Sequence, residues 1–311
     1  MKSTKLNTIL SFALVVALGI SNWSCNNTPK QETKSEVAQA HDDNRFGGLQ
    51  LYTLRNDIGQ NGENLETVLK AVADAGYKNI EAAGYNQGKY YGLTPEEFKS
   101  LLEKYHLNPI SSHQGSITFE NADQELADAI AVGFKYFVIP VPPMGMFTFN
   151  PETQTIGMEG GAKHLTEVIN QLGEKAHAAG ISLLYHNHHF EFTNDEEGIK
   201  VYDYLVENTN PDHVNFEMDL YWVEAAKESQ VDYFKRYPGR FKLWHVKDMD
   251  DQGRFAPVGE GHIDFKTITE NAATSGMEYY FVEQDQTFNH TPLEAIKISH
   301  EGLKKFGLDK K

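Results

Sequence analysis

The chain has 311 residues, 40% of them hydrophobic and 12% aromatic, which is enough to fill one large core or two small ones. Its formal net charge is −16, and an acidic protein is repelled by phosphate backbones, so we expect no nucleic-acid partner. The single cysteine, Cys25, excludes a disulfide framework and a thiolate metal site within one chain, so any metal must be held by His, Asp and Glu.

The first 24 residues have the features of a secretory signal peptide. Two lysines precede an apolar run, residues 9–20, which is too short to span a bilayer as a stable helix. Cys25 stands where a bacterial lipoprotein signal places its lipidated residue, with ordinary signal cleavage as the alternative. Residues 25–44 are polar and typical of a flexible tether. We therefore expect an exported lipoprotein, facing the periplasm, that meets the membrane only through an N-terminal lipid.

From residue 45 onward the chain repeats one pattern, in which a helix-like segment is followed by a glycine and then by an apolar run. The glycines of four copies are Gly76, Gly133, Gly180 and Gly276. A glycine just past a helix adopts the left-handed conformation that ends it, so the chain enters the next strand at once. Two helix starts have Thr as the cap, then Pro, and Glu three residues after the cap, at Thr94 and Thr291. The longest predicted helix covers about residues 159–179.

Eight apolar segments between the helical ones predict strands. They lie near residues 49–54, 79–83, 109–113, 136–140, 181–186, 214–219, 241–246 and 279–283. Eight alternating strand and helix units in roughly 265 residues predict a single-domain (β/α)8 TIM barrel over residues 45–311. A doubly wound open sheet is the alternative, but it usually has a glycine-rich phosphate loop after its first strand. This chain has Leu54-Arg55-Asn56-Asp57 there.

Ligand-type side chains gather where the last four predicted strands end, which is where TIM barrels carry their chemistry. Alternation along the sixth strand points Glu217 and Asp219 into the barrel. Inward carboxylates in a packed interior are costly unless they are paired or bound to a metal. The seventh strand brings His245 and Lys247 to its exit, and the eighth ends in Glu283.

The densest group of such residues follows the fifth strand, in Tyr-His-Asn-His-His-Phe-Glu-Phe at residues 185–192. Strands five to eight would thus supply one ligand each, and the predicted metal ligands are Glu191, Asp219, His245 and Glu283. Three carboxylates and one imidazole suit Mn²⁺ best, with Co²⁺, Mg²⁺ and Zn²⁺ as alternatives. The alternative is that each residue is a polar group at the barrel rim that is hydrogen-bonded within the protein and binds no metal.

The chain resembles the xylose isomerase-like TIM-barrel family of sugar isomerases, epimerases and inosose dehydratases from about residue 46 to 306. The matching pieces are Gln50 to Arg55, Tyr185 to Phe192, Met218-Asp219, His245 to Asp248, Pro257 to Phe265 and Val282-Glu283. The resemblance implies the same four metal ligands. The ketose 3-epimerases of this family have a ligand Glu where this chain has Tyr185 or His186. The histidine-rich version looks more like the inosose dehydratases and the related enzymes that cleave keto-glycosides by β-elimination.

These patterns predict a metal-dependent sugar isomerase or epimerase that removes a proton α to the carbonyl of a non-phosphorylated sugar. A lyase or dehydratase acting on a keto-sugar or 3-keto-glycoside is the alternative. His188 is the expected base, with His186 as the alternative, and Lys247 would stabilise the oxyanion. The expected catalytic residues are His188, Lys247, Glu283 and Glu191. The expected substrate contacts are Gln50, Tyr52, Glu81, His113, His186, Glu260 and His262, with Glu260 or His262 as a proton donor.

Two further functions stay open. A surface lipoprotein that binds carbohydrate without catalysis would use the aromatic residues for stacking on sugars. A metal-dependent endonuclease is disfavoured by the acidic charge. The oligomeric state is left open.

Overall fold

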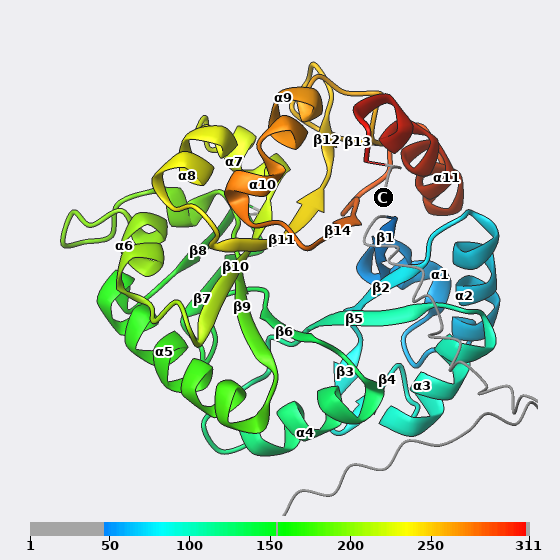
Figure 1. The fold of residues 1–311 in the computed structure, drawn as a ribbon, viewed down its shortest axis with the longest axis horizontal. Helices are drawn as coiled ribbons and strands as arrows, with labels where there is room; N and C mark the ends of the chain where they lie inside the picture. Colours follow the sequence, from blue (N-terminus) through cyan, green and yellow to red (C-terminus); the bar gives the residue numbers. More distant parts are fainter. Residues whose placement is uncertain (1–46, 154, 309–311) are drawn as a thin grey trace, which may run out of the picture. The chain divides into compact units, whose positions relative to one another are not determined.

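The structure is a computed structural model that describes residues 47–153 and 155–308. The expected signal peptide, the lipidation site Cys25 and the tether lie outside the described residues. Eight parallel strands close into a barrel in the order β1-β14-β11-β10-β9-β6-β5-β2, with the helices around it (Figure 1). The barrel strands are β1 (Gly48–Gln50), β2 (Asn79–Ala82), β5 (Asn108–His113), β6 (Tyr136–Ile139), β9 (Ser182–His186), β10 (Val214–Asp219), β11 (Phe241–Val246) and β14 (Tyr279–Val282). The predicted TIM barrel is confirmed.

Helical segments separate these strands. They are η1 (Leu51–Leu54), α1 (Arg55–Ile58), α2 (Leu65–Asp74), α3 (Pro95–Lys104), α4 (Ala122–Val132), α5 (Gly161–Ala179), η2 (Phe190–Phe192), α6 (Val201–Asn208), α7 (Leu220–Ala225), α8 (Gln230–Arg236), α9 (Phe265–Glu270), α10 (Ala272–Ser275), α11 (Pro292–Leu303) and η3 (Lys304–Phe306). The predicted capping boxes at Thr94 and Thr291 are present, and Gly133, Gly180 and Gly276 end helices in the left-handed conformation. Within the described ranges, no helix is long and apolar enough to cross a membrane.

Short hairpins extend three of the loops that follow barrel strands. They pair β3 (Tyr85–Asn86) with β4 (Lys89–Tyr90), β7 (Phe147–Asn150) with β8 (Thr155–Met158), and β12 (Asp248–Met249) with β13 (Phe255–Ala256). They come after β2, β6 and β11, so all three lie at the carboxyl end of the barrel.

The first strand is shorter than predicted, because β1 ends at Gln50 and the next four residues form the 3-10 helix η1. The side-chain Oε1 of Gln50 accepts a hydrogen bond from the backbone N–H of Tyr52 at 2.7 Å and so caps this helix. Leu51 and Leu54 are fully buried in the helical turn. Their burial explains why an apolar run that is not a strand was predicted to be one.

A small apolar cluster distinct from the main core fills the barrel interior. Its buried members are Ile110, Tyr136, Val138, Leu184, Leu243 and Phe281. The strand β1 contributes Gly48 here, because a Cβ at this position would lie 2.3 Å from the backbone oxygen of Tyr280 and 2.5 Å from the ring of Phe281. The barrel is thus closed by apolar packing below the ends of its strands.

Candidate active site

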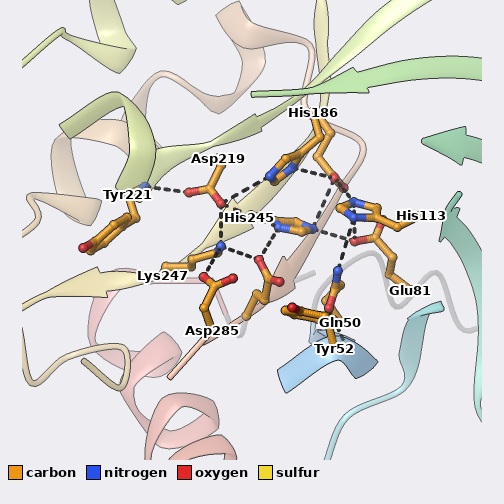
Figure 2. A network of polar contacts seen from close by, with 12 residues as sticks. Gln50, Tyr52, Glu81, His113, His186, Asp219, Tyr221, His245, Lys247 and Asp285 are labelled. Atoms are coloured by element: carbon orange, nitrogen blue, oxygen red, sulfur yellow. Dashed lines mark hydrogen bonds and ion pairs between the residues drawn. The ribbon is translucent and has the colours of Figure 1, made fainter. Parts of the chain in front are cut away.

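A buried polar layer lies on the apolar cluster. His186, His245 and Glu283 each follow an apolar-cluster residue by two positions, so alternation carries them inward and one step toward the carboxyl ends of the strands. The residues of the layer are Glu81, His113, His186, Glu217, Asp219, His245, Lys247 and Glu283 (Figure 2). None of their side chains is more than 8% exposed.

The side chains nearest the strand ends are Asp219, His245 and Glu283, which we call the upper group. Each offers one ligand atom, and these atoms all lie within 4.8 Å of one another. The Nδ1 of His245 is 2.8 Å from Oε2 of Glu283 and 3.8 Å from Oδ2 of Asp219. The Nε2 of His186 lies 3.7 Å from the same Asp219 oxygen, so a second imidazole borders the group.

A lower group of His113, His186, Glu217 and His245 lies one step deeper, because Glu217 precedes Asp219 by two residues on β10. Oε2 of Glu217 is 2.6 Å from Nε2 of His113 and 3.1 Å from Nδ1 of His186. Glu81 joins this group, with its Oε1 2.5 Å from Nε2 of His245. Two histidines therefore face both groups, each with one ring nitrogen toward the upper group and the other toward the lower group.

The charges in this layer shift one another's pKa values. Burial alone would raise the pKa of Glu81, but His113 and His245 hold it well below its usual range. Burial alone would lower the pKa of His113, but Glu81 and Glu217 raise it to about 9. His245 is likewise held well above its usual pKa, despite its burial, by Glu217 and Glu81. The two lower carboxylates are thus matched by imidazolium charge.

Lys247 connects the carboxylates at the top of the layer. Its Nζ is 2.9 Å from Oδ2 of Asp219, 2.5 Å from Oε2 of Glu283 and 2.7 Å from Oδ2 of Asp285. Burial would lower the pKa of Lys247, but these three carboxylates raise it well above its usual value. An ammonium has three hydrogens, and here three carboxylates surround it. Lys247 therefore balances charge in this arrangement, whereas the sequence predicted that it would contact a substrate oxygen.

Asp219 is positioned by the first turn of α7, which follows it in the chain, and by Asn187, which comes directly after β9. Its Oδ1 accepts hydrogen bonds from the backbone N–H groups of Tyr221 and Trp222, which caps α7, and its own N–H donates to Asn187. Its Oδ2 is buried and has no hydrogen bond among the described residues, only ion-pair contacts with Lys247, His245 and His186. Burial raises the pKa of Asp219 to about 6, against the opposing effect of Lys247. A fixed carboxylate with one oxygen left over is what a cation site requires.

Glu191, the ligand predicted from the fifth strand, lies in neither group. After His186 the strand ends, and the chain turns through η2, so the inward alternation does not continue to residue 191. The Oε1 of Glu191 accepts the hydroxyl hydrogen of Tyr185 at 2.9 Å, and Oε2 accepts the backbone N–H of His188 at 2.9 Å. Burial raises the pKa of Glu191 to about 7. Its place beside the other three expected ligands is taken by His186.

His188, the predicted base, borders the polar layer at its mouth. Its ring centroid is 5.1 Å from that of His186 and 5.5 Å from that of Trp222. Burial and the nearby charge of Lys247 lower the pKa of His188 to about 3, so the imidazole is neutral at physiological pH. Its Nδ1 has no hydrogen-bond partner among the described residues. His188 is therefore a neutral imidazole with an available nitrogen.

Four of the predicted substrate contacts lie on the first three barrel strands or just after them, and the structure separates them by depth. Glu81 and His113 belong to the lower group and are buried beneath the strand ends. Nε2 of Gln50 lies 3.3 Å from Nδ1 of His113, which links it to the same layer. Tyr52 is 39% exposed, with the guanidinium of Arg55 4.1 Å from its ring centroid. Tyr52 is thus the most accessible of the four.

The structure does not bring Glu260 and His262 to the polar layer. Glu260 is paired with His290 at 3.1 Å, and the His262 side chain is 46% exposed near Asp251. Their loop is instead held by Asp248, whose carboxylate accepts backbone N–H groups from residues 249, 259, 261 and 263. The segment Pro257 to Phe265, which carries part of the family resemblance, is therefore bound to the buried carboxylate of Asp248 through its backbone. Its residue types alone did not indicate this contact.

A cavity of about 880 Å³ opens beside His189 and Phe190, the two residues that follow His188. Its lining includes Met158, Gly160, His189, Phe190 and Asp195, from β8, the start of α5 and the segment around η2. The residues of the polar layer are not part of this lining. His189 lines the cavity and also contacts Trp222, since the two ring centroids are 5.1 Å apart.

Comparison with known proteins places these features in a family. The family model described as a xylose isomerase-like TIM barrel matches residues 69–306. An inosose dehydratase of Lacticaseibacillus casei is 25% identical over 256 residues, covering 71% of this chain and 82% of the relative. A sugar phosphate isomerase/epimerase from Parabacteroides distasonis ATCC 8503 superposes with a TM-score of 0.69 at 27% identity, covering 85% of this chain and 99% of the other. The IOLI protein with a bound zinc atom shares the fold, with a TM-score of 0.62 at 16% identity over 84% of this chain and 98% of the other.

Proposed function

Because this chain belongs to the xylose isomerase-like TIM barrel family, we propose that it is a divalent-metal-dependent enzyme that removes the proton α to the carbonyl of a non-phosphorylated keto-sugar or glycoside. The observation that carries the proposal is the upper group, in which Asp219, His245 and Glu283 converge at the ends of adjacent strands. His186 on β9 completes the set. Chemistry at the carboxyl ends of the strands is the rule for this fold.

The donor atoms of the upper group fit a divalent ion. Asp219 offers an oxygen without a hydrogen bond, and His186 and His245 each turn one nitrogen toward it. We propose that these residues and Glu283 hold the ion. With His186 rather than Glu191 as the fourth ligand, the set has two imidazoles and two carboxylates. Imidazole ligands favour Zn²⁺ or Co²⁺ over the predicted Mn²⁺. The zinc bound by IOLI supports this choice.

Such an ion would polarise the sugar carbonyl and stabilise the negative charge that forms when the α proton leaves. His188 would accept that proton, because its imidazole is neutral and its Nδ1 has no partner. Lys247 keeps three carboxylates in place around the site. Two arginines follow barrel strands and are partly engaged already: Arg55 donates to the backbone oxygen of Asp285, and Arg254 pairs with the carboxylate of Asp250.

The fate of the carbanion separates two reactions. Loss of a β-oxygen gives a lyase or dehydratase, which the similarity to inosose dehydratase supports. Return of the proton gives an isomerase or epimerase, which the similarity to the Parabacteroides protein supports. Both begin with the same proton transfer, so the first step can be tested without knowing the natural substrate.

The test is hydrogen exchange in D₂O. The purified protein is loaded with Zn²⁺, Co²⁺ or Mn²⁺ and incubated with keto-sugars and 3-keto-glycosides, and deuterium at the α carbon is followed by NMR. We expect exchange that stops when a chelator is added, with an unsaturated product if elimination follows. Sugar binding that survives chelation, with no exchange on any of these compounds, would instead support the carbohydrate-binding alternative.

We also propose that the protein is exported and carries a lipid on Cys25, as its N-terminal sequence predicts. The support is the sequence pattern alone. A Cys25→Ala variant should appear in the soluble periplasmic fraction, whereas the native chain should sediment with membranes. Equal partition of both proteins would refute lipidation at this residue.

A further inference from the structure

We propose that Glu81 and Glu217 are positioning residues that hold His245 and His186 in the two tautomers that ion binding needs. This inference rests on the proposed function, because it assigns a role to the residues beneath the proposed ion site. Both carboxylates are fully buried, and neither is part of the upper group.

The proposed ion site, which is the upper group together with His186, and the lower group cannot both hold an ion, because both would use His186 and His245. His186 has Nδ1 3.1 Å from Glu217 and Nε2 3.7 Å from Asp219. His245 has Nε2 2.5 Å from Glu81 and Nδ1 2.8 Å from Glu283. A neutral imidazole binds an ion through one nitrogen and donates a hydrogen bond from the other. Ions in both groups would require both rings to lose both protons, so one group binds and the other orients.

The contacts of the lower group indicate that it orients the two histidines. Glu81 already accepts a hydrogen bond from the hydroxyl of Ser111 at 2.5 Å on its other oxygen. Glu217 faces three imidazole nitrogens within 3.2 Å through a single oxygen. Each group contains one buried carboxylate oxygen that has no hydrogen bond among the described residues, Oδ2 of Asp219 in the upper group and Oε1 of Glu217 in the lower group. The upper group, in contrast to the lower one, lies at the strand ends, where this fold carries its chemistry. The ion is therefore assigned to the upper group and the acceptor role to the lower group.

The tautomers follow from these contacts. His186 carries its proton on Nδ1 and donates it to Glu217, which leaves the Nε2 lone pair facing Asp219. When an ion binds, His245 would keep its proton on Nε2 and donate it to Glu81, which would leave the Nδ1 lone pair facing Glu283 and Asp219. The two histidines thus need opposite tautomers, and a separate carboxylate selects each one. A carboxylate behind a ligating histidine also fixes the ring and raises its basicity.

The experiment measures ion affinity directly. Glu81→Gln and Glu217→Gln keep the side-chain volume but turn a carboxylate into an amide that can present either a donor or an acceptor to the ring. We expect each variant to bind Zn²⁺ and Co²⁺ about 10- to 100-fold more weakly than the native chain, in competition with a coloured chelator. The bound Co²⁺ should keep its visible absorption bands, because the ligands themselves remain.

Glu125→Gln is the matched control. Glu125 is also a buried carboxylate, but it is held by Ser116 and Asn121 rather than by the polar layer. It should bind ions with native affinity. If Glu81→Gln fails to fold, Ser111→Ala replaces it, because it removes only the hydrogen bond that fixes Glu81. That variant should weaken binding several-fold.

Three results would overturn the inference. Native affinity in Glu217→Gln and in Glu81→Gln would show that the lower carboxylates do not position the histidines. Where Ser111→Ala replaces Glu81→Gln, native affinity in that variant has the same meaning for Glu81. Loss of all binding in Glu217→Gln, with binding retained in Asp219→Asn, would place the ion in the lower group. A native chain that binds no divalent ion would refute the proposed function itself, and that outcome is distinct from the first two.

Discussion

Removing the amine of Lys247 should destabilise the protein far more than removing a surface lysine. A Lys247→Met variant keeps most of the apolar stem but leaves Asp219, Glu283 and Asp285 without the cation they share. Asp219 and Glu283 are fully or almost fully buried, so water cannot replace the lost charge. Like charges confined in a buried site repel one another strongly.

The size of the effect follows from the burial. Breaking a buried ion pair by removing one partner costs about 3–5 kcal/mol, because the remaining charge stays desolvated. Three carboxylates lose their partner here, which places the expected loss at the upper part of that range. The pH dependence has a definite sign. Without Lys247 the raised folded-state pKa of Asp219 rises further and the lowered pKa of Glu283 rises toward its usual value, so the stability deficit of the variant shrinks as the pH falls and these groups become protonated. The deficit should therefore be largest near pH 8 and smaller near pH 5.

Urea unfolding followed by tryptophan fluorescence, with a chelator present, measures this difference. Lys242→Met is the matched control, because Lys242 pairs with Glu278 at 3.2 Å on the surface and both side chains are partly exposed. It should lose less than about 1 kcal/mol. Adding Zn²⁺ should recover more stability in Lys247→Met than in the native chain, since the ion supplies the missing charge. A Lys247→Met variant as stable as the Lys242→Met control at pH 8 would refute the reasoning.

Three further predictions concern the site. Asp219→Asn should bind Zn²⁺ at least about 100-fold more weakly in a chelator competition, because it removes the anionic oxygen that has no hydrogen bond; native affinity would contradict the assignment. His188→Asn should slow α-deuterium exchange by about 10²- to 10⁴-fold with unchanged ion content, whereas the adjacent His189→Asn should stay near the native rate; equal losses in both would argue against His188 as the base. Glu191 has a folded-state pKa raised from 4.5 to about 7, so its contribution to stability is present below pH 4.5 and is lost as the pH rises through 7. Glu191→Gln should therefore become more stable relative to the native chain by up to about 3 kcal/mol between pH 4.5 and pH 8 in urea unfolding with chelator, and parallel pH profiles would count against it.

The barrel was predictable because four of its strands, β2, β6, β9 and β14, follow one sequence pattern, in which a glycine ends the preceding helix and an apolar run comes next. On β10 and β11, where the regular strand continues to its last residue, alternation placed Asp219 and His245 correctly. The interior pairing of Glu217 with two histidines was beyond reach, because it depends on the stagger between strands that are far apart in the sequence.

The prediction for Glu191 shows where alternation stops being informative. Period two holds only while the backbone is extended, and the chain leaves β9 after His186 and turns into η2. Spacing alone cannot predict the direction of a side chain in a turn, and this applies to His188, His189 and Glu191. The same limit applies to Asp285, two residues past Glu283 and outside β14, which joins Lys247 although nothing in its sequence context suggested it.

His245 has one more consequence, for the order in which this protein is assembled. Its pKa is held high by Glu217 and Glu81, so before an ion binds both ring nitrogens carry protons, and the ring donates to Glu81 on one side and to Glu283 on the other. The imidazolium supplies one positive charge between these carboxylates, so the barrel can fold before an ion is bound. At the proposed site, ion binding would then be an exchange reaction in which the ion displaces the Nδ1 proton into solvent. Under the proposed export, the chain would therefore not need to carry a metal ion across the membrane.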